Sequence, residues 1–315
     1  MHVVVASHHR LPVEGYGGPQ RVVVALVQAL ATLGHRVTVL AQPGTKLAAA
    51  SRIVDVPPRA LKNSVDLTPF LPDNADILHA HFPLKQGPKN LPFVQTLHSN
   101  WKPGTPLPPH TIFLSRDHAR RHGSEAFVYN GLDPSDLIFR PRKEQWDLFL
   151  GRLHSDRGYH WAIEAAKRTG RRLIVAGGWR PSFTGDIKYV GEVDGKRKAV
   201  LLARARCLWM PAQWDEPFGL PTIEALFSGT PVLGTKRGAL PEILTPEVGA
   251  VCGTLDEMIA AAAEIGTRDP RACRAHAERW FTNLEMASEY VRMYQAFINT
   301  GSLPSGRVTK AARGR

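Results

Sequence analysis

The sequence lacks any apolar run approaching the roughly 18 residues that a membrane-spanning helix requires. Its first residues, Met1–Val5, have neither the basic start nor the cleavage site of a signal peptide, and they predict a strand instead. Only three cysteines are present, and they are widely spaced and odd in number: Cys207, Cys252 and Cys273. This argues against a disulfide framework and favours reduced, buried thiols, so we expect a cytoplasmic protein.

Acidic residues are also few relative to basic ones. The chain has 40 lysines and arginines against 28 aspartates and glutamates, which gives a formal net charge of +12. Such a charge favours an anionic partner, either nucleotide phosphates, an anionic lipid surface at the inner membrane face, or nucleic acid. A solubilising surface accounts for the same charge, so both interpretations stay open.

Strand and helix patterns alternate along the chain, which at 315 residues is long enough for two domains. Val3–Ala6 predicts a buried parallel strand, a helix begins at Pro19, and Val37–Leu40 predicts the next strand. No G-x-G-x-x-G follows the first strand, which disfavours NAD binding. Further strands are expected at Ile53–Val56, Ile77–Ala80, Phe93–Leu97, Thr111–Leu114 and Ala126–Tyr129.

A second alternating block follows the proline-containing hinge Arg140–Glu144. Alternation on both sides of a hinge predicts two parallel-sheet α/β domains, 1–140 and 141–283. Helices are expected over 255–265 and 268–300, and the basic tail 302–315 is expected to be disordered. The other elements expected here are strands Asp147–Leu150, Arg172–Ala176, Lys188–Val190, Cys207–Met210 and Pro231–Gly234, and helices Tyr159–Thr169, Lys196–Arg204 and Thr222–Phe227.

The segment Asp215–Ala225 holds the most informative pattern. Glu216 and Glu224 lie eight positions apart and flank a turn and the start of a short helix. A helix start presents backbone N–H groups and a positive dipole end, which suits a phosphate. The carboxylates are suited to accept hydrogen bonds from sugar hydroxyls. This combination predicts a nucleotide-sugar site.

The same segment resembles the E-x7-E signature of the family 4 glycosyltransferases, which have the GT-B fold. The resemblance runs from about residue 1 to residue 300. It implies two Rossmann-like parallel-sheet domains facing a central cleft, closing over the donor, with the C-terminal helix, about 284–300, packed back on the N-terminal domain. Other motifs of the family appear in order at Gly15–Pro19, Gly34–Val39, Leu78–His81, Thr96–His98, Tyr129–Asp133, Phe149–Arg152 with Arg157-Gly158, Gly229–Val232 and Gly238–Glu242.

The resemblance assigns roles to particular residues. Arg152 and Arg157 would stabilise the charge that develops on the departing diphosphate. Glu224 would bond the ribose hydroxyls, Glu216 would lie near the donor sugar, and His98 would contact the sugar and the leaving region. Donor contacts are also implied for the backbones of Gly17 and Gly18, for the N–H groups of Phe218, Gly219 and Leu220, and for Val193 beside the base.

A metal site is not expected. His79-Ala80-His81 places two imidazoles on one side of a strand, as a metal would need, but no cysteine or carboxylate cluster lies nearby in the sequence. GT-B enzymes generally need no metal, so we predict structural or sugar-contacting histidines and no cofactor beyond the nucleotide-sugar co-substrate. Two features depart from the family: the N-terminal half is shorter than usual, and Arg157 stands where lysine is usual.

The function implied is a metal-independent hexosyl- or glycosyltransferase that retains anomeric configuration. The donor would be a nucleotide-diphosphate sugar, with a UDP-sugar first and GDP-mannose second. The acceptor hydroxyl would belong to a glycan, a lipid-linked or a small molecule. One alternative is transfer to hydroxymethylated bases in DNA, with Lys196–Lys198 and Arg116–Arg121 as phosphate contacts. The others are a GT-B sugar-nucleotide epimerase and a non-catalytic binding protein.

Overall fold

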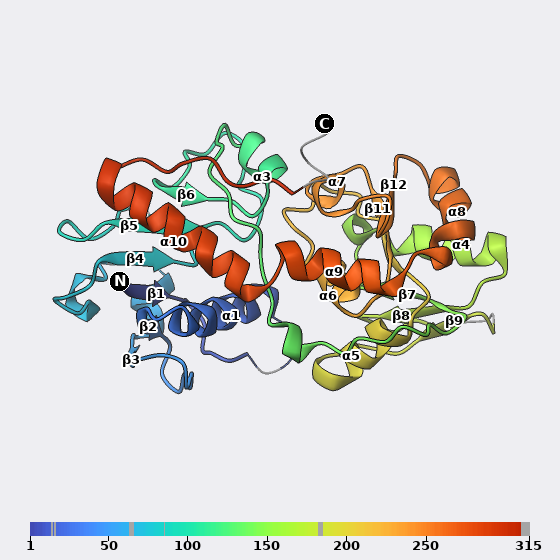
Figure 1. Ribbon diagram of the computed structural model, residues 1–315, viewed down its shortest axis with the longest axis horizontal. Helices are drawn as coiled ribbons and strands as arrows, with labels where there is room; N and C mark the ends of the chain where they lie inside the picture. The colour runs from blue at the N-terminus through green and yellow to red at the C-terminus, as the bar shows by residue number, and fades with distance from the viewer. Residues whose placement is uncertain (14, 16, 63–65, 85, 182–184, 310–315) are drawn as a thin grey trace. The chain divides into compact units, whose positions relative to one another are not determined.

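The computed structural model describes residues 1–13, 15, 17–62, 66–84, 86–181 and 185–309. The chain divides into two compact units, which are drawn in Figure 1 and described separately below. Unit 1 comprises Met1–Asp133 and Phe281–Arg307, and unit 2 comprises Pro134–Trp280 and Val308–Arg315. The chain therefore passes from unit 1 to unit 2 between Asp133 and Pro134. The domain boundary expected from the sequence lies later, after residue 140.

Unit 1 is built on a parallel sheet of six strands in the order β3-β2-β1-β4-β5-β6. Val3, Val4 and Val5 in the central strand have no exposed surface, as the continuous apolar run predicted. The strands are β1 (His2–Ala6), β2 (Arg36–Ala41), β3 (Arg52–Asp55), β4 (Ile77–Ala80), β5 (Phe93–Thr96) and β6 (Thr111–Ile112).

Four α-helices accompany this sheet among the described residues of unit 1, and the last of them follows unit 2 in the sequence. Helix α10 packs against α1 and buries Tyr290, Tyr294 and Phe297. The C-terminal helix thus belongs to the unit formed by the N-terminal residues. The helices are α1 (Gly18–Thr32), α2 (Pro58–Lys62), α3 (Arg116–Arg120) and α10 (Asn283–Thr300).

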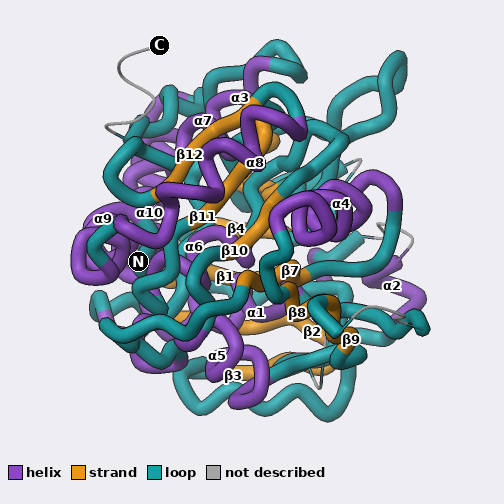
Figure 2. The backbone as a smooth tube through the Cα atoms, turned by 90° about the vertical axis from the view of Figure 1, so that its right-hand side faces the viewer, coloured by secondary structure: helices purple, strands orange, loops and turns teal. Residues whose placement is uncertain are grey.

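Unit 2 repeats the topology of unit 1. Its six parallel strands have the order β12-β11-β10-β7-β8-β9, in which the first strand of the unit, β7, again lies inside the sheet. Figure 2 shows β12, β11 and β10 of this sheet side by side. The strands are β7 (Asp147–Leu150), β8 (Leu173–Ala176), β9 (Ile187–Tyr189), β10 (Leu208–Met210), β11 (Val232–Thr235) and β12 (Gly249–Cys252).

The helices of unit 2 follow its strands, as the alternating pattern predicted. They are α4 (Tyr159–Thr169), α5 (Gly195–Arg204), α6 (Leu220–Phe227), α7 (Leu240–Ile243), α8 (Leu255–Glu264) and α9 (Pro270–Trp280). Cys207, Cys252 and Cys273 are free and buried in this unit, as expected.

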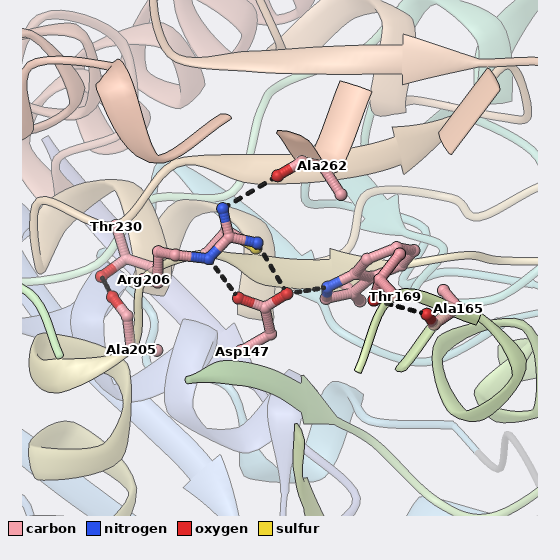
Figure 3. Close-up of polar contacts among 9 residues, drawn as sticks. Asp147, Ala165, Thr169, Ala205, Arg206, Thr230 and Ala262 are labelled. Carbon is pink, nitrogen blue, oxygen red and sulfur yellow. Dashed lines mark hydrogen bonds and ion pairs between the residues drawn. The ribbon is translucent and has the colours of Figure 1, made fainter. Parts of the chain in front are cut away.

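One charged pair lies inside the core of unit 2. Asp147 in β7 is 2% exposed, and Arg206 bonds both of its carboxylate oxygens, at 2.7 and 2.8 Å. Arg206 also donates to the carbonyl of Ala262 in α8 (Figure 3), and the indole N–H of Trp209 bonds Asp147 Oδ2 at 3.1 Å. A buried ion pair is tolerable only when its remaining polar positions are bonded in this way.

The prediction of one helix over 268–300 is wrong. Helix α9 ends at Trp280 and α10 begins at Asn283, with the Thr282 side chain accepting a hydrogen bond from the Glu285 N–H. Around the break, Leu132 pairs with Thr282: its N–H donates to Phe281 O, and its carbonyl accepts from Asn283 N–H, both at 2.9 Å. A capping threonine and this pairing replace the helical hydrogen bonds.

The strand predicted at Ala126–Tyr129 and the disordered tail also differ from the structure. Only an isolated bridge between Phe113 and Phe127 forms, because β6 ends at Ile112.

In the tail, Gly306 N–H donates to Glu125 O at 3.0 Å, and Thr309 is fully buried. Residues 302–309 are therefore held in place, whereas 310–315 lie outside the described residues. Within the described part, no helix is long and apolar enough to cross a membrane.

Candidate active site

Three loops of unit 2 converge at one edge of its sheet. They follow β7, β10 and β11, and they carry Arg152 and Arg157, Glu216, and Gly238 respectively. Since the carboxyl ends of parallel strands meet at one edge, the order of the strands brings these loops together. This is the edge at which open α/β sheets bind ligands.

One glutamate of the motif and one of the arginines form the centre of this region. Arg157 Nη1 lies 2.5 Å from Glu216 Oε2, and the indole N–H of Trp214 donates to the same oxygen at 3.1 Å. The Arg157 guanidinium carbon lies 4.8 Å from the centroid of the Trp214 ring. Arg157 is 36% exposed and Glu216 only 8% in their side chains, so the pair has one side toward solvent.

Burial raises the pKa of the Glu216 carboxyl, and Arg157, Trp214 and the backbone of Phe218 act in the opposite direction. The Phe218 backbone is therefore engaged with Glu216 in this structure. The Glu216 side chain is thus held by three groups.

Helix α6 begins beside this carboxylate. Gly219 is its N-cap in the left-handed conformation, and Pro221 lies in its first turn. Thr222 Oγ1 is buried there without a hydrogen-bond partner among the described residues. Glu224, further along the helix, is 2% exposed, and Lys198 Nζ in α5 lies 2.7 Å from its Oε1. The second glutamate is thus held by a lysine that is itself only 15% exposed.

Two glycines fix the backbone of the site. Gly158 has φ +68° and lies so close to Pro211 that a Cβ would collide with its carbonyl. Gly238 has φ +58°, and a Cβ there would collide with the backbone oxygen and nitrogen of Glu216. The next residue, Ala239, donates its N–H to Glu216 O at 2.9 Å. These close approaches hold the Arg157 loop and the Glu216 loop in place.

The other donor-site residues expected in unit 2 lie around this centre. Arg152 is exposed and Val193 is 6% exposed, so Val193 offers little surface to a base. Phe218 and Gly219 are buried and Leu220 is half-buried. The structure brings Arg157 and the Phe218 backbone, just before α6, into contact with Glu216.

The remaining expected residues belong to unit 1. Gly17 is the N-cap of α1 and Gly18 its first residue, while Tyr16 of the same motif lies outside the described residues. His98 is half-buried, and its Nε2 lies 2.9 Å from His81 Nδ1. Burial, with His8 nearby, lowers the pKa of His98 to about 4, so its imidazole is neutral at about pH 7.

His79 is held in the core. Its Nδ1 lies 2.6 Å from the Tyr294 hydroxyl and its Nε2 lies 2.8 Å from Thr96 Oγ1. Burial, with a contribution from His98, lowers the pKa of His79 to about 3. These contacts make His79 a link between β4, β5 and α10. Among the described residues, no group of three or more His, Cys, Asp or Glu is arranged to hold a metal ion.

Sequence reasoning gives no place in the site to Lys198 or Trp214, and it notes Gly238 only as part of a family motif. It groups Lys198 with its basic neighbours as a possible DNA contact, although the helix expected over Lys196–Arg204 could direct it inward. Trp214 lies two positions before Glu216, so the spacing alone suggests no contact between side chains. The turn that follows brings the indole N–H back to the carboxylate.

Comparisons with known proteins identify the family of the chain. Residues 16–135 match the family model described as Glycosyltransferase Family 4, and residues 145–267 match the model described as Glycosyl transferases group 1. The solved structure of AviGT4, a glycosyltransferase involved in avilamycin A biosynthesis, is 28% identical with a TM-score of 0.80, over 96% of this chain and 98% of that one.

Two curated relatives differ in how much of their length is matched. The glycogen synthase of Mycobacterium tuberculosis is 30% identical over 48% of the chain, and the match spans only 41% of that enzyme. The phosphatidyl-myo-inositol mannosyltransferase of the same species is 25% identical over 91% of the chain and 95% of its own length.

Two Rossmann-like units with this likeness define a glycosyltransferase of the GT-B fold. The chain belongs to the family 4 glycosyltransferases. The fold and family expected from the E-x7-E motif are thereby confirmed.

Proposed function

We propose that the chain transfers a sugar from a nucleotide-diphosphate sugar to an acceptor hydroxyl with retention of anomeric configuration. The observation that carries the proposal is the pairing of each glutamate of the motif with a cation, Glu216 with Arg157 and Glu224 with Lys198. The paired glutamates offer carboxylate oxygens as acceptors for sugar and ribose hydroxyls, while Arg157 keeps donors for the incoming diphosphate.

In this proposal Arg152 and Arg157 bind the diphosphate, and their attraction strengthens as the glycosidic bond breaks and charge builds on the leaving group. The N–H groups of Gly219 and Leu220 at the start of α6 add to that attraction. Glu224 binds the ribose and Glu216 the donor sugar. His98, whose pKa is lowered to about 4, contacts the sugar as a neutral hydrogen-bond donor or acceptor.

The first experiment is thermal unfolding against UDP-, GDP-, ADP- and TDP-sugars, with UDP-sugars first and GDP-mannose second. A donor at about 100 times its dissociation constant stabilises the folded state by about 2.7 kcal/mol, which shifts the melting temperature by several degrees. We expect stabilisation by one nucleotide class and its loss in Glu224→Ala. No stabilisation by any donor, in protein shown to be folded, contradicts the proposal.

Retention is tested on hydrolysis of the donor, with water in the place of the acceptor hydroxyl. Proton NMR of the freshly released sugar should show the anomer of the donor before mutarotation sets in. The same spectra should show no epimerised donor, which separates transfer from the epimerase alternative. Turnover should persist in EDTA if no metal is required.

The acceptor is proposed to be a glycan, a lipid-linked or a small molecule. The contacts of the described basic residues do not favour DNA. Of the basic run that would contact DNA phosphates, Lys198 is bound to Glu224 and Arg197 donates to the carbonyl of Val190. In the second run, Arg121 bonds Asp117 and Asn100. Flotation with anionic liposomes tests whether the basic surface serves a membrane.

A further inference from the structure

Trp214 contacts both charged groups at the centre of the site, although it lies outside the E-x7-E motif. Its Nε1 donates to Glu216 Oε2 at 3.1 Å, and its ring centroid lies 4.8 Å from the Arg157 guanidinium carbon. Arg157 Nη1 reaches the same oxygen of Glu216 at 2.5 Å. One carboxylate oxygen therefore receives two donors that are also in contact with each other.

The ring suits a guanidinium better than an ammonium. A planar guanidinium packs flat on an indole and keeps its N–H donors at its edge, because the stacking itself uses none of them. The ring thus restrains Arg157 while leaving donors for a second anion besides Glu216. A lysine at position 157 would place one point charge there and present no planar group to the ring.

The indole N–H acts on the other member of the pair. Glu216 is buried, and burial favours its neutral form. The Trp214 N–H favours the charged form, as do Arg157 and the Phe218 backbone. The same side chain thus fixes the position of the cation and supports the charge of the anion.

We propose that Trp214 is a positioning residue that couples Arg157 to Glu216, so that both charged groups meet the donor in a fixed geometry. The ligand that Arg157 and Glu216 bind is inferred from the proposed function. The coupling among the three side chains is independent of that function, and it can be tested without any ligand.

The ligand-free test compares the pH dependence of unfolding in four chains: wild type, Glu216→Gln, Trp214→Phe and the double variant. The pKa of Glu216 is raised in the folded chain, so its contribution to stability is present at low pH and is lost as pH rises through the folded pKa. The stability of wild type should therefore fall relative to that of Glu216→Gln over that range.

Trp214→Phe removes a hydrogen bond to the charged carboxylate, so the fall caused by Glu216, which ends at its folded pKa, should extend about one pH unit higher. The upper end of the fall is read by comparing wild type with Glu216→Gln, and Trp214→Phe with the double variant. The same upper end in both comparisons overturns the proposal for Glu216. A uniform loss of stability at every pH is the result that a purely structural tryptophan would give.

The second test measures the dissociation constant of UDP in a cycle of Trp214→Leu and Arg157→Lys. If the ring acts through the guanidinium, Trp214→Leu should weaken binding by about tenfold in the wild-type chain and by less than about threefold in the Arg157→Lys variant. Trp214→Phe keeps a ring and should fall between wild type and Trp214→Leu. If Trp214→Leu weakens UDP binding by the same factor in the wild-type chain and in the Arg157→Lys variant, the proposed action of Trp214 on Arg157 is overturned.

These outcomes are separable from failure of the donor assignment. If wild type binds no UDP, the cycle is repeated with GDP and ADP, and loss of all three contradicts the proposed function. The pH comparison still decides whether Trp214 couples to Glu216.

Discussion

The ammonium group of Lys198 lies 2.7 Å from the carboxylate of Glu224, and this pair joins helix α5 to helix α6 inside unit 2. Both side chains are largely buried, at 15% and 2% exposure. Removing one partner of such a pair leaves a charge with too little compensation. The pair therefore supports the fold of unit 2 around the motif's second glutamate.

Lys198→Met should destabilise the protein by about 3 kcal/mol in urea unfolding, since it removes the ammonium group that lies 2.7 Å from the buried Glu224 carboxylate. Lys198→Arg should cost much less. The double variant Lys198→Met with Glu224→Gln should be more stable than Lys198→Met alone, because no uncompensated charge remains. Additive losses in this cycle would show that the two side chains do not interact.

The same lysine should affect recognition of the ribose. Wild type should prefer UDP over 2′,3′-dideoxy-UDP, because only UDP carries hydroxyls for Glu224. In a folded Lys198→Met variant this preference should shrink by about tenfold, a loss of one charge-assisted hydrogen bond. If UDP and its dideoxy analogue weaken by the same factor, Lys198 acts on stability alone. Isothermal titration calorimetry measures both constants.

Gly238→Ala should abolish donor stabilisation and lower the melting temperature. A methyl group there meets the backbone of Glu216 and must displace the loop that carries it. Gly170→Ala is the matched control, since Gly170 also has a positive φ, +62°, but has nothing within 4 Å of its Cβ position. The control should lose only about 1 kcal/mol and keep donor binding. Equal effects of the two substitutions would refute the close approach as the cause.

Acidification should weaken unit 1 through His79. The folded pKa of His79 is lowered to about 3, so the unfolded chain takes up the proton first as pH falls below about 6.5. His79 therefore contributes stability above about pH 6.5 that is lost as pH falls toward its folded pKa, with a slope of about 1.4 kcal/mol per pH unit.

The comparison of wild type with His79→Gln at about pH 7.5 and about pH 5.5, on either side of the ordinary histidine pKa, isolates this slope. The other titratable groups around His79 remain in both chains: His81, His98, Tyr290 and Tyr294. Wild type should be the more stable chain at the higher pH, and its advantage should narrow at the lower pH. Parallel stability curves would contradict a neutral His79.

Arg206→Met should be strongly destabilising, by about 3–5 kcal/mol, because it leaves Asp147 charged in the core of unit 2. The double variant Asp147→Leu with Arg206→Met should recover a large part of this loss, although Trp209 then lacks its acceptor. Chemical unfolding of the three variants measures the effect. A double variant no more stable than Arg206→Met would show that the charge is not the cause.

Much of the fold could be predicted because the central strands are continuous apolar runs. Val3–Ala6 and Ile77–Ala80 have buried residues on both faces, a pattern typical of parallel strands covered by helices. The prediction of a single helix over 268–300 is wrong for a physical reason. Apolar periodicity continues through Phe281, but the bridge to Leu132 breaks the helix, and no local pattern reveals a partner so distant in sequence.

The candidate site was predictable mainly in its motif residues. Glu216 and Glu224 follow from their spacing around a helix start, which is local information. Their partners Arg157 and Lys198 lie far away in sequence, and the strand order of the sheet brings them near. The burial of Asp147 could not be predicted for the same reason. An acidic residue in a strand is expected to be exposed unless its buried partner, here Arg206, is known.

Helix α10 belongs to unit 1 but follows all strands and helices of unit 2 in the sequence. During synthesis residues 1–133 leave the ribosome long before Tyr290 and Tyr294 exist to bond Thr96 and His79. All of residues 134–280 are made in that interval. All strands and helices of the second unit are therefore made before α10, and a nascent chain or fragment that stops at Trp280 lacks the contacts that Tyr290 and Tyr294 make with the first unit.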